Sequence, residues 1–477
     1  FDNHFARDCM KQRFVIQEGN QSLALFFAGW GSSGELLNGI NAPCDVMIAW
    51  DFADFDFDMS QVAGYKNIYL FAWSFGIVGA MHLMAEYPRL PIVLRVAING
   101  TQEPISDHNG IPVSIFEGTA KNLNERNLQK FYRRMCSSAG SYTAFMSTNP
   151  SLDVESLRVQ LYNVKNAQPT LMKQQWDKVI ISQNDFIFPI ENCLNAWNGY
   201  CKELVIEDQG YHLPESFEQI ICSNVIDKDL IRERFSESFS TTYDAEAQVQ
   251  GDIAQRMVEL WKRYATTNEG CAVIEVGCGS GIFTRKYLPV LYPSKLILND
   301  LCADPDVVVN LTTTQYQFLQ CDAETIELPD ESVDYITSTS ALQWFENLES
   351  FFAKAYTWLK PGGYLIFSTF GTDNLREIRQ ITNAGLNYRD IDVLKAMLLK
   401  HFEIIFADEE RNIMHFDSPI DVLRHIKKTG VNSLIKGENT QSQVRKLIKN
   451  YNKFEFEGKE VCPLTYHPIY IIARKNG

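Results

Sequence analysis

The sequence predicts an α/β protein of two domains, the first over residues 10–225 and the second over residues 226–477. The chain has 477 residues, which is too long for one ordinary hydrophobic core. In both halves short apolar runs alternate with helical stretches, which is typical of a mainly parallel sheet covered by helices. The alternation stops near residues 222–232 and then starts again, so we place the domain boundary there.

Composition and charge exclude several classes of protein. The chain is 45% hydrophobic and carries a net charge of −15, which is typical of a globular protein and argues against nucleic-acid binding by bulk charge. Its apolar runs are far shorter than the roughly 20 residues that span a bilayer, so we expect no membrane span. We see no signal-peptide pattern. The 11 cysteines are scattered without CxxC pairs, so we expect no disulfide framework, no metal site and a location in the reducing cytoplasm.

In the first half we expect six buried strands, because six short runs are apolar almost throughout. These runs are residues 23–27, 46–50, 68–73, 93–99, 113–116 and 179–182. Residues 119–176 contain no clear strand and are typical of helices. A long helical insertion between two strands often covers a functional site, so we predict a cap there.

Ser74 lies between a buried strand and a helix-forming stretch, which is the arrangement of a nucleophile elbow. Downstream, Asp185 follows the predicted strand at 179–182, and His212 follows a further apolar strand predicted at 204–206. The chain order of the three residues is that of an α/β-hydrolase. We predict that His212 accepts the Ser74 proton and that Asp185 orients the imidazole. Asp51 and Asp208 also lie near strand ends and remain alternatives for the acid.

Two backbone N–H groups are candidates to stabilise an oxyanion. Trp30 lies in a glycine-flanked loop after the first strong strand, and Phe75 directly follows the predicted nucleophile. Taken alone, however, a serine at this place could simply cap the helix that follows it.

Residues 26–33, 72–76 and 210–214 resemble the pimeloyl-[acyl-carrier protein] methyl ester esterases of biotin synthesis, in their compact form. The resemblance covers about residues 10–217. It implies an α/β-hydrolase fold in which Ser74 and His212 are catalytic and Trp30 and Phe75 supply the oxyanion N–H groups. Ala72 is a departure, because it stands where the elbow usually has its first glycine.

The predicted cap is basic. It holds eight basic and three acidic side chains, whereas the rest of the first half holds eight basic and 21 acidic ones. A basic cap on an acidic body suits an acidic macromolecular ligand, and the resemblance makes that ligand an acyl carrier protein. The residues predicted to bind it are Lys121, Arg126, Lys130, Arg133 and Arg134. A solvated helix face is the alternative.

In the second half we expect strands at residues 272–276, 295–300, 316–320, 333–338 and 364–369, and an amphipathic helix at 246–264. The first strand leads into a loop with glycines at 277, 279 and 281. Glycines let a backbone turn tightly and approach a cofactor closely. Their spacing differs from the GxGxxG pattern of dinucleotide-binding enzymes.

Acidic residues mark the ends of these strands. Glu275 precedes the glycine loop, and Asp300 ends the next strand, where a carboxylate can bind ribose hydroxyls. Asp322 follows the third strand, where a side chain can meet the adenine amine.

This set of features resembles the class I, Rossmann-like methyltransferases that use S-adenosylmethionine (AdoMet). Residues 239–243, 341–344, 368–371, 425–431 and 463–467 further resemble malonyl-[acyl-carrier protein] O-methyltransferase, over about residues 230–475. The resemblance implies that the following residues contact or enclose AdoMet: Glu275, Gly277, Gly279, Gly281, Asp300, Asp322, Ala323, Tyr243 and Gln248.

Cations are expected near the substrate carboxylate of such an enzyme. Arg376 and Arg379 follow the strand at 364–369 and are our candidates, with surface helix positions as the alternative. Arg424, Lys427 and Lys428 could contact a carrier protein, or could belong to a solvated helix face.

The two resemblances together predict a bifunctional enzyme of biotin synthesis. The second domain would methylate the free carboxylate of malonyl-[acyl-carrier protein], and the first would hydrolyse pimeloyl-[acyl-carrier protein] methyl ester. Two alternatives remain: the same two reactions on small free carboxylates and esters, or a methyltransferase attached to an inactive hydrolase-fold scaffold.

Overall fold

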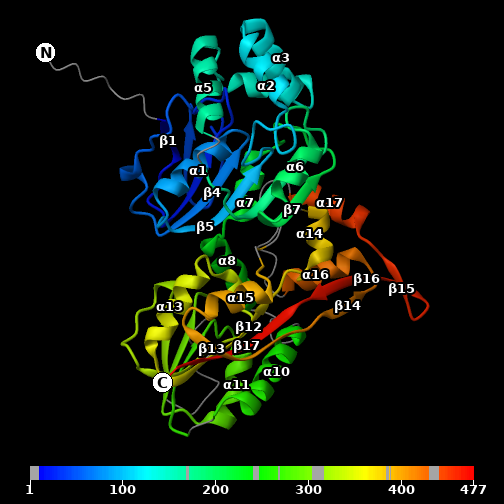
Figure 1. The fold of residues 1–477 in the computed structure, drawn as a ribbon. Coiled ribbons are helices and arrows are strands. Elements are labelled where there is room, and N and C mark those ends of the chain that lie inside the picture. Colours follow the sequence, from blue (N-terminus) through cyan, green and yellow to red (C-terminus); the bar gives the residue numbers. More distant parts are fainter. Residues whose placement is uncertain are drawn as a thin grey trace, which may run out of the picture. The chain divides into compact units, whose positions relative to one another are not determined.

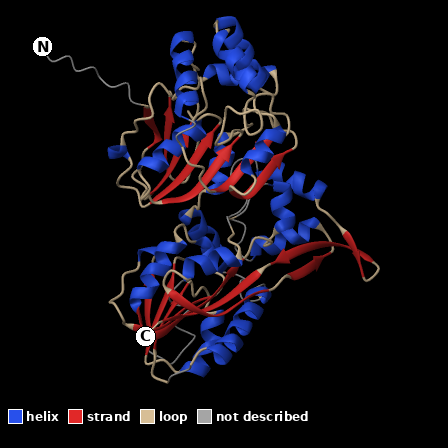
Figure 2. Ribbon diagram, in the orientation of Figure 1, coloured by secondary structure: helices blue, strands red, loops and turns tan. Residues whose placement is uncertain are grey.

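The computed structural model describes residues 10–167, 171–239, 247–266, 269–302, 316–382, 386, 388–428 and 440–476. The chain divides into two compact units, Phe1–Val225 and Ile226–Gly477, here called the N-terminal unit and the C-terminal unit. Each is an α/β structure built on one large sheet (Figures 1 and 2).

The N-terminal unit contains a seven-stranded sheet in the order β1-β3-β2-β4-β5-β6-β7. All neighbouring strands are parallel except β1, which runs antiparallel to β3. The strands are β1 (Lys11–Ile16), β2 (Ser22–Phe27), β3 (Asp45–Trp50), β4 (Asn67–Trp73), β5 (Ile92–Ile98), β6 (Trp176–Ser182) and β7 (Cys201–Glu207). The central strands β2 and β4 are buried on both faces, which explains why their sequences are apolar without alternation.

Helices connect these strands. α1 (Gly76–Glu86) follows β4, α6 (Ile190–Trp197) follows β6, and α7 (Phe217–Asn224) follows β7. Five of the six predicted strands are confirmed. The prediction of a strand at 113–116 is wrong, because these residues form the first turn of a helix that begins after Pro112. A four-residue run with three apolar side chains fits either structure, and two of these side chains, Val113 and Ile115, are exposed.

The cap consists of four helices between β5 and β6: α2 (Val113–Lys121), α3 (Glu125–Met135), α4 (Ala139–Ser147) and α5 (Val154–Ala167). α2, α3 and α5 stand together at one end of the sheet (Figure 1). Leu128, Tyr132 and Met135 are the buried residues of α3, so this helix packs through one apolar stripe.

The C-terminal unit contains a seven-stranded sheet in the order β10-β9-β8-β11-β12-β17-β13, in which β17 alone runs antiparallel to its neighbours. The strands are β8 (Ala272–Val276), β9 (Lys295–Asp300), β10 (Tyr316–Gln320), β11 (Val333–Ser338), β12 (Leu359–Phe370), β13 (Phe402–Glu409) and β17 (Pro468–Lys475). The five strands and the amphipathic helix predicted for this half are confirmed.

Helices cover both faces of this sheet (Figure 2). The strands alternate between the two apolar cores: in β8, Val273 joins one core and Ile274 joins the other. The helices are α8 (Lys228–Phe239), α10 (Gln248–Tyr264), α11 (Ile282–Leu291), α13 (Leu348–Trp358), α14 (Arg376–Thr382) and α15 (Ile391–Leu398).

A smaller sheet lies between β13 and β17 in the sequence. It has the order β14-β16-β15, with β14 (Asn412–Phe416), β15 (Phe454–Phe456) and β16 (Lys459–Tyr466). Helices α16 (Pro419–Lys428) and α17 (Thr440–Asn450) separate β14 from β15 along the chain. Across the part of the chain that the structure describes, no helix is both long and apolar enough to cross a bilayer.

Candidate functional site

Ser74 lies at a sharp turn between β4 and α1. Its φ is +58°, in the left-handed region that residues other than glycine avoid, and its N–H donates to the Ile98 carbonyl oxygen at 2.9 Å. The turn leaves no room behind it, because a Cβ atom on Gly76 would press against the carbonyl oxygen of Phe27. A strained serine at a strand–helix turn is typical of a nucleophile whose hydroxyl must stand clear of the backbone.

Ser74, His212 and Asp185 form one hydrogen-bonded row. His212 Nε2 lies 3.1 Å from Ser74 Oγ, and His212 Nδ1 lies 2.8 Å from Asp185 Oδ2. The other carboxylate oxygen of Asp185 accepts the N–H groups of Ile187 and Phe188. Because a carboxylate can only accept, Nδ1 of His212 carries the hydrogen, and Nε2 is left to accept the serine proton.

The backbone of His212 is fastened to the sheet. The indole N–H of Trp73 and the side-chain amide of Asn99 donate to the His212 carbonyl oxygen at 2.9 and 3.0 Å. The imidazole is only 1% exposed. Within the described ranges, neither Asp51 nor Asp208 makes a hydrogen bond to His212, so the geometry favours Asp185 over these two alternatives.

Two backbone N–H groups near Ser74 have no acceptor among the described residues. They belong to Trp30, in the loop after β2, and to Phe75. This loop approaches the serine closely, because a Cβ atom on Gly29 would lie 3.2 Å from the Ser74 Cβ. The Trp30 indole donates to the Leu157 carbonyl oxygen at 2.9 Å, which ties the loop to the cap. Such N–H groups can stabilise a negative oxygen that develops on a substrate at Ser74.

A pocket of about 420 Å³, counting the space open to solvent, lies beside Ser74, and cap helices supply much of its wall. Arg134 is the only charged residue among the described residues that line it. The wall is otherwise mainly apolar, through Ile111, Ile115, Phe116, Phe131, Leu161 and Ile187. An uncharged acyl chain would therefore fit this pocket better than an ionised one.

The five basic residues predicted to bind a carrier protein are all exposed. Lys121 ends α2, and the other four share the face of α3 opposite its buried stripe. In the described part of the chain, none of the five has a carboxylate within ion-pair distance. Arg133 lies over the Tyr142 ring, 4.8 Å from its centroid. The face therefore presents uncompensated positive charge next to the Ser74 pocket.

The C-terminal unit contains a second site, at the loop between β8 and α11. Gly277, Gly279 and Gly281 all have positive φ, of 69°, 52° and 82°. A Cβ atom on Gly277 would collide with the Ala341 side chain. The loop therefore requires glycine, as expected for a backbone that passes close to a ligand.

Glu275, which precedes this loop, is hydrogen-bonded to α11 and is not among the described residues that line the pocket. Its carboxylate accepts hydrogen bonds from Thr284 at 2.6 Å and from Tyr287 at 2.7 Å, both on α11. Burial raises the pKa of Glu275 to about 7, although these two hydrogen bonds act to lower it. Glu275 is not among the described residues that line the pocket, so the prediction that it contacts the cofactor directly gains no support from this geometry.

Asp300, at the end of β9, shapes the loop and lines the pocket. Its carboxylate accepts the N–H of Gly279 at 2.8 Å and the N–H of Cys302 at 2.7 Å. Gly277, Gly279, Asp322 and Ala323 also line the pocket, whereas Gly281, the N-cap residue of α11, does not.

Lys228 joins α8 to the two acidic residues that follow β10 at the pocket. This lysine, at the start of α8, lies 3.1 Å from Asp322 Oδ1 and 2.7 Å from Glu324 Oε2. Burial acts to lower the pKa of Lys228, but the carboxylates of Glu324 and Asp322 outweigh it and raise the pKa above the usual value. Lys228 is therefore charged at neutral pH. Sequence reasoning missed this residue because nothing before α8 marked it as part of a site.

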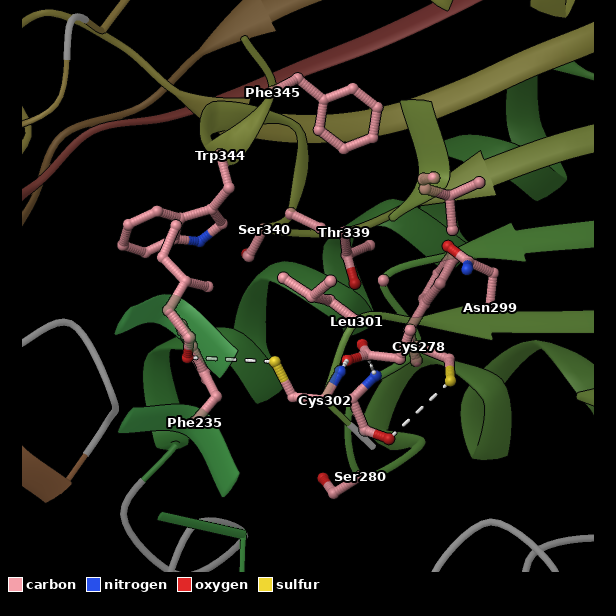
Figure 3. A pocket seen from close by; sticks show the side chains of 18 of the residues that line it. Phe235, Cys278, Ser280, Asn299, Leu301, Cys302, Thr339, Ser340, Trp344 and Phe345 are labelled. Carbon is pink, nitrogen blue, oxygen red and sulfur yellow. Dashed lines mark hydrogen bonds between the residues drawn. The ribbon is translucent and has the colours of Figure 1, made fainter. Parts of the chain in front are cut away.

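α8 forms one wall of the pocket through Lys228, Ile231 and Phe235, which recur at helical spacing. The Phe235 ring meets Trp344 edge-on, with the two centroids 5.7 Å apart. Figure 3 shows Phe235 and Trp344 on one side of the pocket and Asn299 and Cys278 on the other.

Several predicted cofactor or substrate residues lie elsewhere. Tyr243 falls outside the described residues. Gln248 is exposed at the first position of α10, and Gln250, two residues later, lines the pocket instead. Arg376 and Arg379 are also outside the lining: Arg376 lies beside Glu377 at 3.4 Å, and Arg379 donates to the Thr372 carbonyl oxygen at 2.6 Å. Both are engaged locally on α14, so the prediction that they meet the substrate carboxylate gains no support.

The second pocket has the polarity that a cofactor such as AdoMet needs. Its volume is about 890 Å³, counting the space open to solvent. Ser340 Oγ and Gln250 Oε1 are buried in its lining without a hydrogen-bond partner among the described residues. Unsatisfied buried polar atoms need a polar ligand or water. Together with Asp300, Asp322 and the glycine loop, they fit a nucleoside-containing cofactor.

Comparisons with known proteins agree with this division. The family described as "Pimeloyl-ACP methyl esterase BioG" matches residues 10–222, and the family "Methyltransferase domain" matches residues 274–367. A malonyl-[acyl-carrier protein] O-methyltransferase of Bacteroides fragilis is 38% identical over 456 residues, covering 95% of this chain and 92% of that protein. The chain belongs to the malonyl-[acyl-carrier protein] O-methyltransferase family. S-adenosylmethionine is therefore its methyl donor.

Other members of the malonyl-[acyl-carrier protein] O-methyltransferase family are shorter. One from Bacteroides thetaiotaomicron is 43% identical over 264 residues, which is 53% of this chain and 99% of that protein. A crystal structure of BioG from Haemophilus influenzae is 27% identical and covers 43% of this chain and 94% of that chain, with a TM-score of 0.39. The two family matches and the Bacteroides fragilis relative confirm both resemblances seen in the sequence, one in each half.

Proposed function

We propose that the chain is a bifunctional enzyme of biotin synthesis that adds and later removes the same methyl ester. The C-terminal unit methylates the free carboxylate of malonyl-[acyl-carrier protein], and the N-terminal unit hydrolyses pimeloyl-[acyl-carrier protein] methyl ester to release methanol. The observation that carries the second activity is the row Ser74–His212–Asp185, which has the hydrogen bonds of a working serine hydrolase.

Methyl transfer needs little from catalytic side chains. A malonyl carboxylate is ionised at neutral pH, since unperturbed carboxyl pKa values lie near 4, so no general base is required. AdoMet supplies an electrophilic methyl group when it is bound. We propose that Asp300 holds its ribose and Asp322 its adenine amine, while the glycine loop lets the backbone come close. Alignment of the carboxylate with that methyl group then carries the rate.

Ester hydrolysis follows from the geometry around Ser74. His212 Nε2 takes the Ser74 proton as Oγ attacks the ester carbonyl carbon, and the N–H groups of Trp30 and Phe75 bind the resulting oxyanion. The C–O bond to the methoxy group breaks, and His212 returns the proton to form methanol. Water then hydrolyses the acyl-enzyme by the same route. The sheet order and the strained serine between β4 and α1 support an α/β-hydrolase fold.

The proposal explains why a methyl group is added and later removed. A terminal carboxylate is costly to bury, whereas its methyl ester can enter apolar sites during chain elongation. The mainly apolar wall of the Ser74 pocket is then suited to a lengthened, uncharged chain. The basic face of α3, which we propose binds the acidic carrier protein, lies beside the mouth of that pocket through Arg134.

Growth without biotin tests both activities in the intact chain. The chain should restore growth to a bacterial host that lacks its malonyl-[acyl-carrier protein] methyltransferase and, separately, to a host that lacks its pimeloyl ester esterase. Ser74→Ala should abolish only the second rescue. Rescue of the esterase-deficient host by the Ser74→Ala chain would contradict the proposed hydrolase and would favour an inactive scaffold.

A further inference from the structure

The C-terminal unit carries a basic surface of its own, at the described residues 419–428 and 440–453, which we call the basic insertion. It holds seven basic side chains and one acidic side chain, whereas the other residues of 226–477 hold 21 basic and 34 acidic ones. Positive charge concentrated on an acidic body creates a local potential that attracts anionic macromolecules. The described parts of the basic insertion include α16 and α17.

Three of its cations have no acidic partner in the described part of the chain. Lys427 on α16 and Arg445 and Lys449 on α17 are exposed, and none has a carboxylate within ion-pair distance there. Arg424 and Lys453 form only exposed ion pairs, which contribute little in water and exchange readily. The surface therefore offers positive charge that the unit itself does not neutralise.

The arrangement on α17 turns these charges outward. Arg445 and Lys449 are one helical turn apart and so lie on the same face. Ile448, between them, is 40% exposed, whereas Leu447 is fully buried against the unit. α17 is thus anchored through Leu447, and it presents two exposed cations with the exposed apolar side chain of Ile448 beside them.

The strand order and helix packing place α17 on the β12 side of the pocket, away from Asp322. The carboxyl ends of parallel strands meet at one edge of a sheet, and this pocket is lined at the ends of β8, β9 and β11. β12 is the next strand after β11, on the side away from Asp322. α14 follows the carboxyl end of β12, and α17 packs against α14 (Figure 1).

The helix against which α17 packs, α14, is held at the pocket edge by hydrogen bonds. Glu377 on α14 accepts the Thr465 N–H at 3.0 Å and the Thr465 hydroxyl at 2.5 Å, which ties α14 to β16. The N–H of Gly371, directly after β12, donates to the His467 carbonyl oxygen at 2.8 Å. The basic insertion is therefore held in a defined position relative to the pocket.

We propose that the basic insertion is the surface on which the methyltransferase unit docks its carrier protein. An acidic carrier protein seated there would present its malonyl thioester from the β12 side of the pocket. This inference rests on the proposed function, and it adds a second docking surface, separate from the one proposed on α3. Each unit then has its own basic surface for the same kind of acidic carrier.

Charge reversal with a matched control tests this assignment. The test variant is Arg445→Glu with Lys449→Glu; the control is Lys262→Glu with Lys295→Glu, which changes the net charge equally. Lys262 lies in the last turn of α10, and Lys295 begins β9 at the amino edge of the sheet, opposite the pocket. Methyl transfer is measured with malonyl-carrier protein and with a malonyl thioester of pantetheine that has no carrier, at low and high salt.

We expect the test variant to raise KM for malonyl-carrier protein at least tenfold at low salt, with AdoMet affinity and turnover of the small thioester unchanged. The difference from wild type should shrink at high salt because screening removes the attraction. The control variant should behave as wild type. Equal kinetics of test and control variants on the carrier substrate, or an equal loss on both substrates, would overturn the docking surface alone. If the wild-type chain transferred no methyl group to malonyl-carrier protein, the proposed function itself would fail.

Discussion

Ser74 keeps its hydroxyl exposed to a substrate only while its backbone stays in the left-handed region. That conformation costs a non-glycine residue on the order of 1–3 kcal/mol, which its surroundings must offset. The hydrogen bond from the Ser74 N–H to β5 and the absence of a side chain at Gly76 do so. The elbow tolerates Ala72 in place of the usual glycine because this residue still belongs to the regular, fully buried strand β4.

Asp185→Asn should lower kcat for ester hydrolysis about 10³- to 10⁴-fold while methyl transfer stays unchanged. An asparagine at this position can offer an N–H to His212 Nδ1, which favours the tautomer that cannot accept the Ser74 proton. Hydrolysis and methyl transfer should be assayed on the same preparation. Asp208→Asn is the matched control and should leave hydrolysis intact. Full activity of Asp185→Asn would exclude this residue as the triad acid.

Glu275 should make the C-terminal unit less stable as the pH rises from about 4.5 to 7. Its pKa is about 7 in the folded chain and about 4.5 when unfolded, so over this range the unfolded chain ionises first and is favoured. The shift corresponds to about 3 kcal/mol. Glu275→Gln should therefore be more stable than wild type above pH 7, with a flatter pH profile.

Urea unfolding at about pH 5 and about pH 8 measures the free energy of unfolding. A hydrogen-exchange pulse at fixed pH then monitors the opening of β8. The exposed Glu259→Gln on α10 is the control and should follow the wild-type profile. A Glu275→Gln profile parallel to that of wild type would show that the buried carboxyl does not carry the pH dependence.

At the scale of elements, α8 is the part of the C-terminal pocket that could not be predicted from the sequence. Strand ends and the glycine loop could be predicted because each is a local pattern with one structural solution. α8 begins 44 residues before β8 and has no motif; only its packing against Trp344 and the acids after β10 gives it a role. Gln248 and Gln250 show a related limit, because two residues along a helix change the face by about 200°.

The cap shows a different limit of the sequence. Residues 113–116 have the composition of a buried strand, yet they form the start of α2, where Ile115 helps to line the Ser74 pocket. Periodicity cannot separate a short strand from a short helix segment. The triad was predictable nevertheless, because Ser74, Asp185 and His212 each follow a strand that the sequence identifies clearly.

Lys228→Met should weaken AdoMet binding about tenfold. The change leaves Asp322 and Glu324 without their shared cation and loosens the wall formed by α8. Titration calorimetry with AdoMet measures the affinity. Arg232→Met, one turn further along α8, removes only an exposed ion pair with Asp229 and should bind as wild type does. Equal affinities for the two variants would mean that α8 is not held in place by Lys228.

At the scale of the whole molecule, one chain is proposed to carry two opposing reactions. The esterase would undo the first step if it accepted the short malonyl ester. Its pocket wall argues for discrimination by chain length, since each buried methylene contributes about 0.8 kcal/mol. Four additional methylenes in the pimeloyl ester thus correspond to about 3 kcal/mol, or on the order of 10²-fold in kcat/KM.

Methanol release from malonyl and pimeloyl methyl esters on the same carrier protein measures this preference. Phe116→Ala and Leu161→Ala should reduce it, because both residues line the pocket. Thr143→Ala, on the solvent side of α4, is the control. Equal kcat/KM for the two esters on the wild-type chain would show that something other than pocket burial prevents the reverse reaction.

The position of α8 also determines how the chain can be cut. α7 ends at Asn224 and α8 begins at Lys228, so three residues separate the last helix of one unit from the cofactor wall of the other. A fragment trimmed to the second large sheet and its amphipathic helix would begin near residue 246 and would lack Lys228, Ile231 and Phe235. Such a fragment could fold and still hold its methyl donor poorly, whereas one that starts at residue 226 would retain the complete wall.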